Sequence, residues 1–200
     1  MKKGVFIVLE GLDGSGITTQ CLELGKNLSS LGYKVYITGE PTNSVIGCLI
    51  RSCLSGWIFF NNKVLALLYA ADRLLHVEKI KSKIEEGYIV ISGRYLFSSL
   101  AYQSIDPEIS FEWIKELNKF AIKPDIAIFI DTSIDECLRR INLGKPRKEL
   151  FEDRSKLEAI RANFERVVRE ENLIVVDGNR SIQEVAQDIK KIVIDYLTRI

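Results

Sequence analysis

The chain has 200 residues, of which 46% are hydrophobic, and its 28 basic and 27 acidic side chains give a formal net charge of +1. This length suits one domain with a sizeable core, so we expect residues 1–200 to form a single domain. The charge balance argues against a general nucleic-acid-binding or membrane-binding surface. No apolar stretch reaches transmembrane length and no signal-peptide pattern is present, so we expect a cytoplasmic protein.

Short apolar runs alternate with helical patterns along the chain. The predicted strands are residues 5–9, 34–38, 89–91, 126–130 and 173–177, and the first is a continuous apolar run typical of a strand buried on both faces. The predicted helices are residues 18–31, 45–54, 63–86, 97–102, 110–119, 134–143, 155–171 and 181–198. This alternation predicts a three-layer α/β fold, in which a five-stranded parallel sheet carries helices on both faces. Ligands of such sheets bind at the carboxyl ends of the strands.

A glycine-rich turn follows the first strand and opens the first helix. Residues 11–19 are Gly-Leu-Asp-Gly-Ser-Gly-Ile-Thr-Thr. The usual phosphate-binding P-loop is G-x-x-x-x-G-K-[ST], with a lysine that reaches the outer phosphates and a hydroxyl that binds Mg²⁺. Ile17 stands at the lysine position, and Thr18 is the candidate Mg²⁺ ligand. Helix N-terminal amides bind anions without a lysine, but the charge that assists phosphoryl transfer is missing.

The missing lysine leaves two interpretations open. The protein is either a phosphotransferase that takes its positive charge from elsewhere or a nucleotide-binding protein with weak or no catalysis. The basic stretch Asn142–Lys148 interrupts two helices, and we expect a lid at approximately residues 142–152.

The cysteines and the single histidine give weaker signals. The four cysteines match no zinc-binding spacing, so free thiols are favoured over a metal site. We expect His76 to be a partly buried surface residue rather than a catalyst.

Several segments together resemble the thymidylate kinase family, in the right order and over almost the whole chain. They are Glu10–Gly16, Gly39–Thr42, Leu67–Arg73, Gly87–Tyr95, Ser98–Gln103 and Asp177–Val185. The resemblance implies a P-loop nucleoside monophosphate kinase that transfers the γ-phosphoryl group of ATP to dTMP with Mg²⁺. It also implies a homodimer formed through the long helix that carries Leu65, Leu68 and Leu75. Residues 57–60 are either core or an exposed apolar patch. A related kinase with another acceptor, such as dUMP, remains an alternative.

The resemblance assigns residues to the acceptor site. Arg73 would read the thymine edge, and Tyr69, one helical turn earlier, would stack on the base. Arg94 would grip the acceptor phosphate with its planar fork, close to Asp13. The nucleoside pocket and the region near the monophosphate would include Ser98, Tyr102, Gln103, Glu40, Pro41 and Arg51.

The resemblance also assigns the ATP site. The phosphates would bind at Gly11, Asp13, Gly14, Ser15, Gly16, Ile17, Thr18 and Thr19. Asn179 and Arg180 would lie near the adenine, flanked by Arg139 or Arg140.

This chain departs from the family pattern near the phosphates. The family carries its catalytic arginine either at the position of Gly14 or in the lid, so a lid residue is expected here. The candidates are Arg139, Arg140, Lys145, Arg147 and Lys148, and Arg147 is the first of them. Gly93 replaces the family's aspartate before Arg94, and this loss could be coupled to Ile17. Because this aspartate is absent, we expect the hydroxyl of Ser92 to hydrogen-bond a metal-bound water.

Overall fold

The computed structural model describes residues 4–144, 150–151 and 153–200. Five strands form one sheet in the order β2–β3–β1–β4–β5, and every neighbouring pair is parallel. The strands are β1 (Val5–Gly11), β2 (Val35–Gly39), β3 (Ile89–Gly93), β4 (Ile126–Asp131) and β5 (Ile174–Asp177). The predicted parallel sheet is therefore confirmed, with each strand near its expected position.

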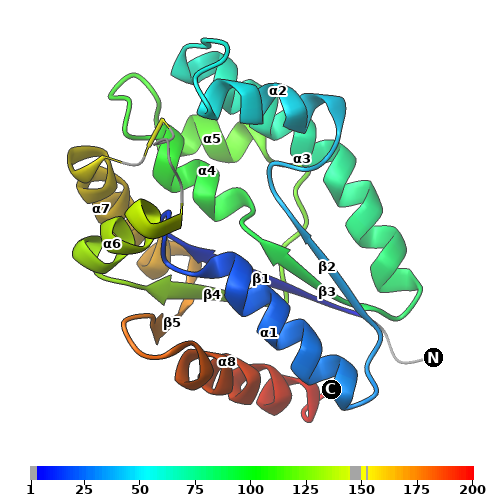
Figure 1. Cartoon of the computed structure of the whole chain (residues 1–200). Coiled ribbons are helices and arrows are strands. Elements are labelled where there is room, and N and C mark those ends of the chain that lie inside the picture. Colours follow the sequence, from blue (N-terminus) through cyan, green and yellow to red (C-terminus); the bar gives the residue numbers. More distant parts are fainter. Residues whose placement is uncertain (1–3, 145–149, 152) are drawn as a thin grey trace.

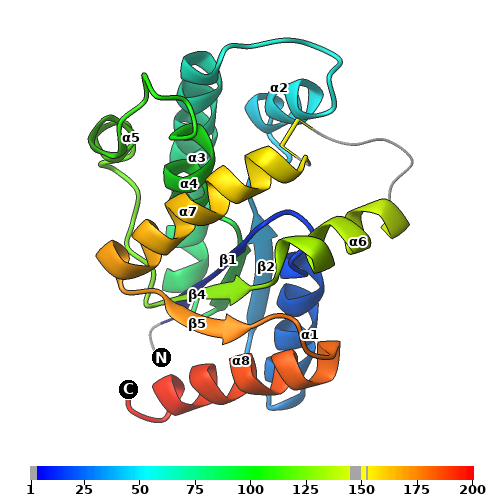
Figure 2. The same ribbon diagram turned by 90° about the vertical axis from the view of Figure 1, so that its left-hand side faces the viewer.

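Helices cover both faces of the sheet, as the alternating pattern predicted (Figures 1 and 2). One face packs against α1 (Ile17–Ser30) and α8 (Ile182–Leu197). The other carries α2 (Val45–Leu54), α3 (Asn62–Glu85), α4 (Leu96–Gln103), α5 (Phe111–Leu117) and α7 (Arg154–Glu171). The remaining helix, α6 (Ile134–Gly144), follows β4. The helix ends differ from the predicted ones by at most two residues, which is the usual uncertainty of helix ends.

The central strand β1 divides the apolar core into two clusters. Val5, Ile7 and Leu9 pack with residues of α1 and α8, whereas Phe6 and Val8 pack with residues of α3, α4 and α7. Alternating side chains of a strand point to opposite faces, so a continuous apolar run is what a strand buried on both sides requires.

The start of α1 differs from the starts of several other helices. The side chains of Ser44, Asn61, Ser110 and Ser181 each accept a hydrogen bond from the first turn of the helix that follows. The cap of α1 is Gly16, which makes no such side-chain bond. Because the first N–H groups of a helix have no partner within the helix, those of α1 remain available to an anion.

Among the described residues, no helix combines the length and apolarity needed to cross a bilayer. The described part of the chain also has no group of three or more His, Cys, Asp or Glu placed to hold a metal ion. All four cysteines are free.

Candidate active site

Two cavities meet at the carboxyl ends of the strands. The larger, of about 1030 Å³, is lined by the P-loop, the start of α1, the end of β2 and part of α3. The smaller, of about 230 Å³, lies between α2, α3 and α4. Four residues line both cavities: Asp13, Glu40, Pro41 and Arg94. A group bound in one cavity can therefore reach a group bound in the other at this shared wall.

The P-loop has the backbone shape of an anion-binding turn. Gly14 and Gly16 have φ angles of 80° and 99°, in the region that favours glycine. Successive N–H groups in such turns form an anion-binding concavity. A Cβ on Gly14 would lie 2.5 Å from the carbonyl oxygen of Cys137, so this position has no room for a side chain. An arginine at position 14 would require the loop or the facing backbone of Cys137 to move.

Ile17 points mostly into the core. Its side chain is buried and belongs to the apolar cluster of Cys21, Leu24 and Ile91, beneath α1. It touches the floor of the larger cavity without bringing any charge there. Thr18, the next residue, is exposed and lines the same cavity.

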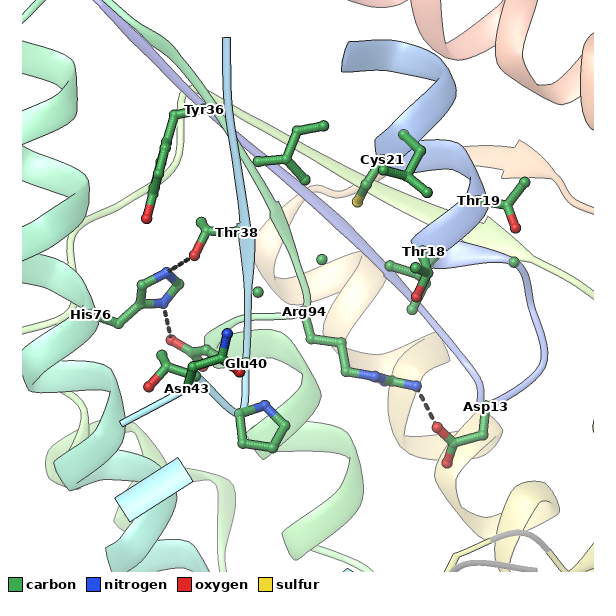
Figure 3. Close-up of a pocket in the computed structure, with 18 of the residues that line it drawn as sticks. Asp13, Thr18, Thr19, Cys21, Tyr36, Thr38, Glu40, Asn43, His76 and Arg94 are labelled. Atoms are coloured by element: carbon green, nitrogen blue, oxygen red, sulfur yellow. Dashed lines mark hydrogen bonds and ion pairs between the residues drawn. The ribbon is translucent and has the colours of Figure 1, made fainter. Parts of the chain in front are cut away.

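Arg94 is the basic residue at the shared wall. It has a φ of 69°, unusual for a residue with a side chain. Its Nη2 donates to Oδ1 of Asp13 at 2.6 Å (Figure 3), and its Nη1 donates to the carbonyl of Gly11 at 2.9 Å and to Oγ of Ser98 at 3.1 Å. The guanidinium also lies over the ring of Tyr102, 5.0 Å from its centroid. These contacts fix the fork in one orientation facing both cavities.

Beneath Arg94 lies a fully buried carboxylate that the sequence reasoning did not select. Glu10 accepts hydrogen bonds from the N–H groups of Tyr95 and Ser98, at 2.8 and 3.1 Å, and from Oγ of Ser98 at 2.5 Å. Burial raises the pKa of Glu10 to about 7, although Ser98 and Arg94 favour its charged form. The sequence did contain a signal for Glu10, because it is a charged residue near the end of an otherwise apolar strand.

Arg73 is buried in the wall of the smaller cavity. Its Nε and Nη2 donate to Oε2 of Glu40 at 2.9 and 2.6 Å, and Nη2 also donates to Oγ of Ser99 at 2.9 Å. Nη1 donates to Oδ1 of Asn118. A guanidinium has five N–H donors, so one N–H on Nη1 has no acceptor in the described part of the chain and is left for a ligand. Ser99 and Asn118 were missed because only the tertiary fold brings them to Arg73.

Unpaired polar atoms mark the rest of the smaller cavity. The hydroxyl of Tyr102 and Oε1 of Gln103 are buried and have no hydrogen-bond partner among the described residues. Tyr69 lines the same space, and burial raises the pKa of its phenol, which stays neutral. Phe151 closes the cavity and packs edge-on against Tyr102, 5.4 Å between ring centroids. An apolar slot with a few unpaired polar atoms suits a nucleobase.

Other predicted acceptor residues lie nearby with different contacts. Arg51 lines the smaller cavity and donates from Nη1 to the carbonyl of Pro41 at 2.9 Å. Ser98 also lines it, but its hydroxyl is held between Glu10 and Arg94. The hydroxyl of Ser92 donates to the backbone carbonyl of Arg94 at 2.8 Å and is fully buried, which corrects the expectation that it serves a metal-bound water.

Of the two adjacent arginines of α6, Arg140 lines the larger cavity and Arg139 does not. Arg140 donates to the carbonyl of Ser15 at 3.2 Å and to that of Gly178 at 3.1 Å, which ties the P-loop to the loop after β5. Arg139 is exposed and pairs with Glu136 through two bonds of 2.7 Å.

Asn179 and Arg180 lie on the loop between β5 and α8. Asn179 accepts a hydrogen bond from the N–H of Ser133 at 2.9 Å, and Arg180 pairs with Asp188. Neither residue lines either cavity. Arg147, Lys145 and Lys148 lie outside the described residues.

The larger cavity offers few protein ligands to a Mg²⁺ ion. The hydroxyl of Thr18 lines that cavity at the open N-terminus of α1. Mg²⁺ usually keeps several waters and takes one or two protein groups together with substrate phosphates. Thr18 and a bound nucleotide would satisfy that pattern without a cluster of carboxylates.

Phosphoryl transfer between two nucleotides needs a phosphate-binding loop at one cavity and fixed positive charge where the two meet. The fold and the site thus define a P-loop nucleoside monophosphate kinase. The family model described as thymidylate kinase matches residues 9–189. The chain belongs to the thymidylate kinase family, so the predicted resemblance and the class of phosphotransferase are confirmed.

Relatives with the same description match along nearly their full lengths. A protein of Methanocaldococcus jannaschii named "Probable thymidylate kinase" is 38% identical over 201 residues, which cover 100% of this chain and 99% of the relative. Proteins of the same name from Thermococcus gammatolerans and Pyrococcus abyssi are 38% and 39% identical. The match to the Thermococcus protein covers 93% of this chain and 94% of the relative, and the match to the Pyrococcus protein covers 96% of each.

Proposed function

We propose that this protein transfers the γ-phosphoryl group of ATP to dTMP, giving dTDP and ADP. The observation that carries this proposal is the position of Arg94 and Asp13 in the wall common to both cavities. With ATP at the P-loop and dTMP in the smaller cavity, the donor and acceptor phosphates would approach each other there. We assign the reaction to the cytoplasm, as expected from the sequence.

In this proposal the smaller cavity holds the acceptor. The free N–H of Arg73 meets a carbonyl of the thymine edge, and Oε1 of Gln103 accepts from a base N–H. Tyr69 and Phe151 supply flat apolar surface against the base. Arg94 donates to the monophosphate, with Asp13 holding the guanidinium in place.

The larger cavity holds the donor. The open amides of the P-loop and of the first turn of α1 bind its phosphates, and Thr18 is the protein ligand of Mg²⁺. Mg²⁺, when bound, neutralises charge on the donor phosphates. Arg140, tied to the P-loop, contributes positive charge beside the nucleotide. Arg147 in the lid is assigned to the transferring group.

Catalysis then consists of positioning and charge stabilisation. The acceptor phosphate oxygen attacks the γ-phosphorus, and the ADP oxygen leaves on the opposite side, with no covalent enzyme intermediate. Arg94 holds the attacking phosphate by two donors and suppresses its repulsion from the donor. The apolar surroundings strengthen this interaction because they exclude water.

A second copy of the chain is the proposed protein partner. α3 exposes Leu67, Leu74 and Leu75, which suits a helix that packs against another protomer. Leu65, expected at that surface, is instead fully buried in the core. Light scattering coupled to size-exclusion chromatography tests the dimer, and Leu74→Glu with Leu75→Glu is expected to yield monomers.

The reaction is tested by turnover of purified protein with ATP and Mg²⁺ and with dTMP, dUMP and other deoxynucleoside monophosphates offered in turn. We expect dTMP to have the highest kcat/KM, and Arg94→Ala to lower it by about 10³-fold or more. Arg199→Ala removes an exposed arginine outside both cavities and serves as the control. Nucleotide binding without turnover by the starting protein would contradict the kinase assignment, and preference for another acceptor would contradict dTMP.

A further inference from the structure

The only histidine of the chain lines the larger cavity and contacts Glu40, which lines both cavities. His76 is buried on α3, one turn after Arg73. Its Nδ1 lies 3.0 Å from Oε1 of Glu40, and its Nε2 lies 2.8 Å from Oγ1 of Thr38 (Figure 3). The expectation of a partly buried surface residue was therefore wrong, because both ring nitrogens are engaged inside the protein.

The two oxygens of Glu40 have separate partners. Oε1 meets His76, whereas Oε2 accepts the two N–H bonds from Nε and Nη2 of Arg73. All three side chains are almost completely buried. A carboxylate held at one oxygen only can rotate about its last bond, and that rotation would break the paired contact with Arg73.

We propose that His76 is a positioning residue for the acceptor site, which holds Glu40 so that Arg73 presents its remaining N–H to the base. The inference rests on the proposed function, because it assigns that N–H to the acceptor. A neutral ring fits both contacts: Nδ1–H donates to Glu40, and Nε2 accepts the hydroxyl proton of Thr38. His76 touches no substrate and acts through Glu40.

The contacts that run from Thr38 through His76 and Glu40 to Arg73 connect the two cavities. Thr38 and His76 line the larger cavity, Arg73 lines the smaller one, and Glu40 lines both. A change at Thr38 should therefore act on the acceptor, although Thr38 itself faces the donor cavity. A purely structural role would instead change both KM values in parallel, and a direct role in ATP binding would change the KM for ATP.

A matched pair of substitutions separates the two ring nitrogens. The amide nitrogen of asparagine stands at the level of Nδ1, and that of glutamine at the level of Nε2. His76→Asn therefore keeps the donor to Glu40, whereas His76→Gln loses it. We expect His76→Gln to raise the KM for dTMP about tenfold, with the KM for ATP nearly unchanged. His76→Asn should raise it much less, and the exposed control Glu78→Gln should leave it unchanged.

Thr38→Val keeps the shape of the side chain and removes the hydroxyl. We expect it to raise the KM for dTMP by a few fold and to leave the KM for ATP unchanged. This variant carries the kinetic test if His76→Gln does not fold, which its thermal unfolding midpoint reveals.

The tautomer of His76 gives a readout that needs no turnover. Because the chain has one histidine, the ring ¹⁵N signals of the untagged, labelled protein belong to His76 alone. A protonated Nδ1 and a bare Nε2 support the proposal. The opposite tautomer, equal losses in His76→Asn and His76→Gln, or parallel changes in both KM values would overturn it. Failure of the proposed function is seen separately, in the acceptor preference of the starting protein.

Discussion

A Cβ atom on Gly93 would lie 3.2 Å from Cγ2 of Ile17, so the two residues that depart from the family pattern face each other at the floor of the larger cavity. The same atom would lie 3.3 Å from Sγ of Cys21. The absence of a side chain at 93 thus leaves the space that the buried Ile17 fills. The two departures are linked by packing as well as by the loss of opposite charges.

This contact predicts a non-additive pair of substitutions. Ile17→Lys alone puts a charge into an apolar cluster and should lower the free energy of unfolding by about 2–4 kcal/mol. Gly93→Asp alone crowds Ile17 and adds an unpaired carboxylate, with an expected cost of ~1–3 kcal/mol. The double variant restores an ion pair, so it should be more stable than the sum of the single effects by about 1 kcal/mol or more.

Urea denaturation of the four proteins measures this coupling, and kcat with dTMP measures its effect on catalysis. Gly93→Ala is the control, because it adds the Cβ without the charge. We expect kcat of the double variant to exceed that of either single variant. Additive free energies would mean that the two positions are independent.

The buried Glu10 predicts a change of stability with pH. Its pKa is raised from an ordinary 4.5 to about 7, so the folded state holds this proton more tightly than the unfolded state. The stabilisation is therefore complete below about pH 4.5 and is lost as the pH rises to about 7. Glu10→Gln removes this contribution. Between about pH 4.5 and pH 7, the free energy of unfolding of the starting protein should fall by about 3 kcal/mol relative to that of Glu10→Gln.

Glu10 also predicts an acidic limb in the rate profile. When Glu10 is ionised, the hydroxyl of Ser98 donates to it and turns its lone pair toward Arg94. A protonated Glu10 can donate to the same oxygen and compete with Arg94. We expect kcat/KM for dTMP to fall below about pH 7 in the starting protein, and this limb to be absent in Glu10→Gln. An unchanged limb in that variant would assign it to another group.

The buried pair of Glu40 and Arg73 predicts a large loss of stability. Glu40→Gln keeps the shape of the side chain but leaves the guanidinium of Arg73 without its counter-charge, at a cost of about 3–5 kcal/mol. Glu116→Gln breaks the exposed pair with Lys119 and should cost under about 1 kcal/mol. Urea denaturation compares them, and equal losses would show that burial of the pair has no special weight.

The sequence was sufficient for the order of elements and for the motif residues. Continuous apolar strands, the glycine-rich turn and short connections restrict the chain to one parallel α/β arrangement. Arg94 and Asp13 each follow a strand, and parallel strands bring their carboxyl ends together, so their meeting could be anticipated.

The buried polar partners could not be predicted in the same way. α3 turns Asp72, Arg73 and His76 inward, whereas helical periodicity places charged residues on the solvent side. Asn118, the residue that caps the C-terminus of α5, contacts Arg73 from 45 positions away, and no local pattern signals that contact. The sequence also could not predict which way the side chain of Ile17 points, because this depends on the space that Gly93 leaves at the end of β3.

The crowded backbone at Gly14 leaves no room for a catalytic arginine there, and we propose that Arg147 supplies this charge instead. A Cβ there would lie 2.5 Å from the carbonyl oxygen of Cys137, and the φ angle is 80°. We expect Arg147→Ala to lower kcat by about 10³-fold, because the charge on the transferring group is lost, with the KM for dTMP nearly unchanged. Lys148→Ala, a neighbouring basic residue, is the control and should have a much smaller effect. Adding Gly14→Arg to Arg147→Ala should fail to restore kcat, since the loop has no room for the side chain. If Arg147→Ala is fully active in turnover with ATP and dTMP, this role belongs to another basic residue.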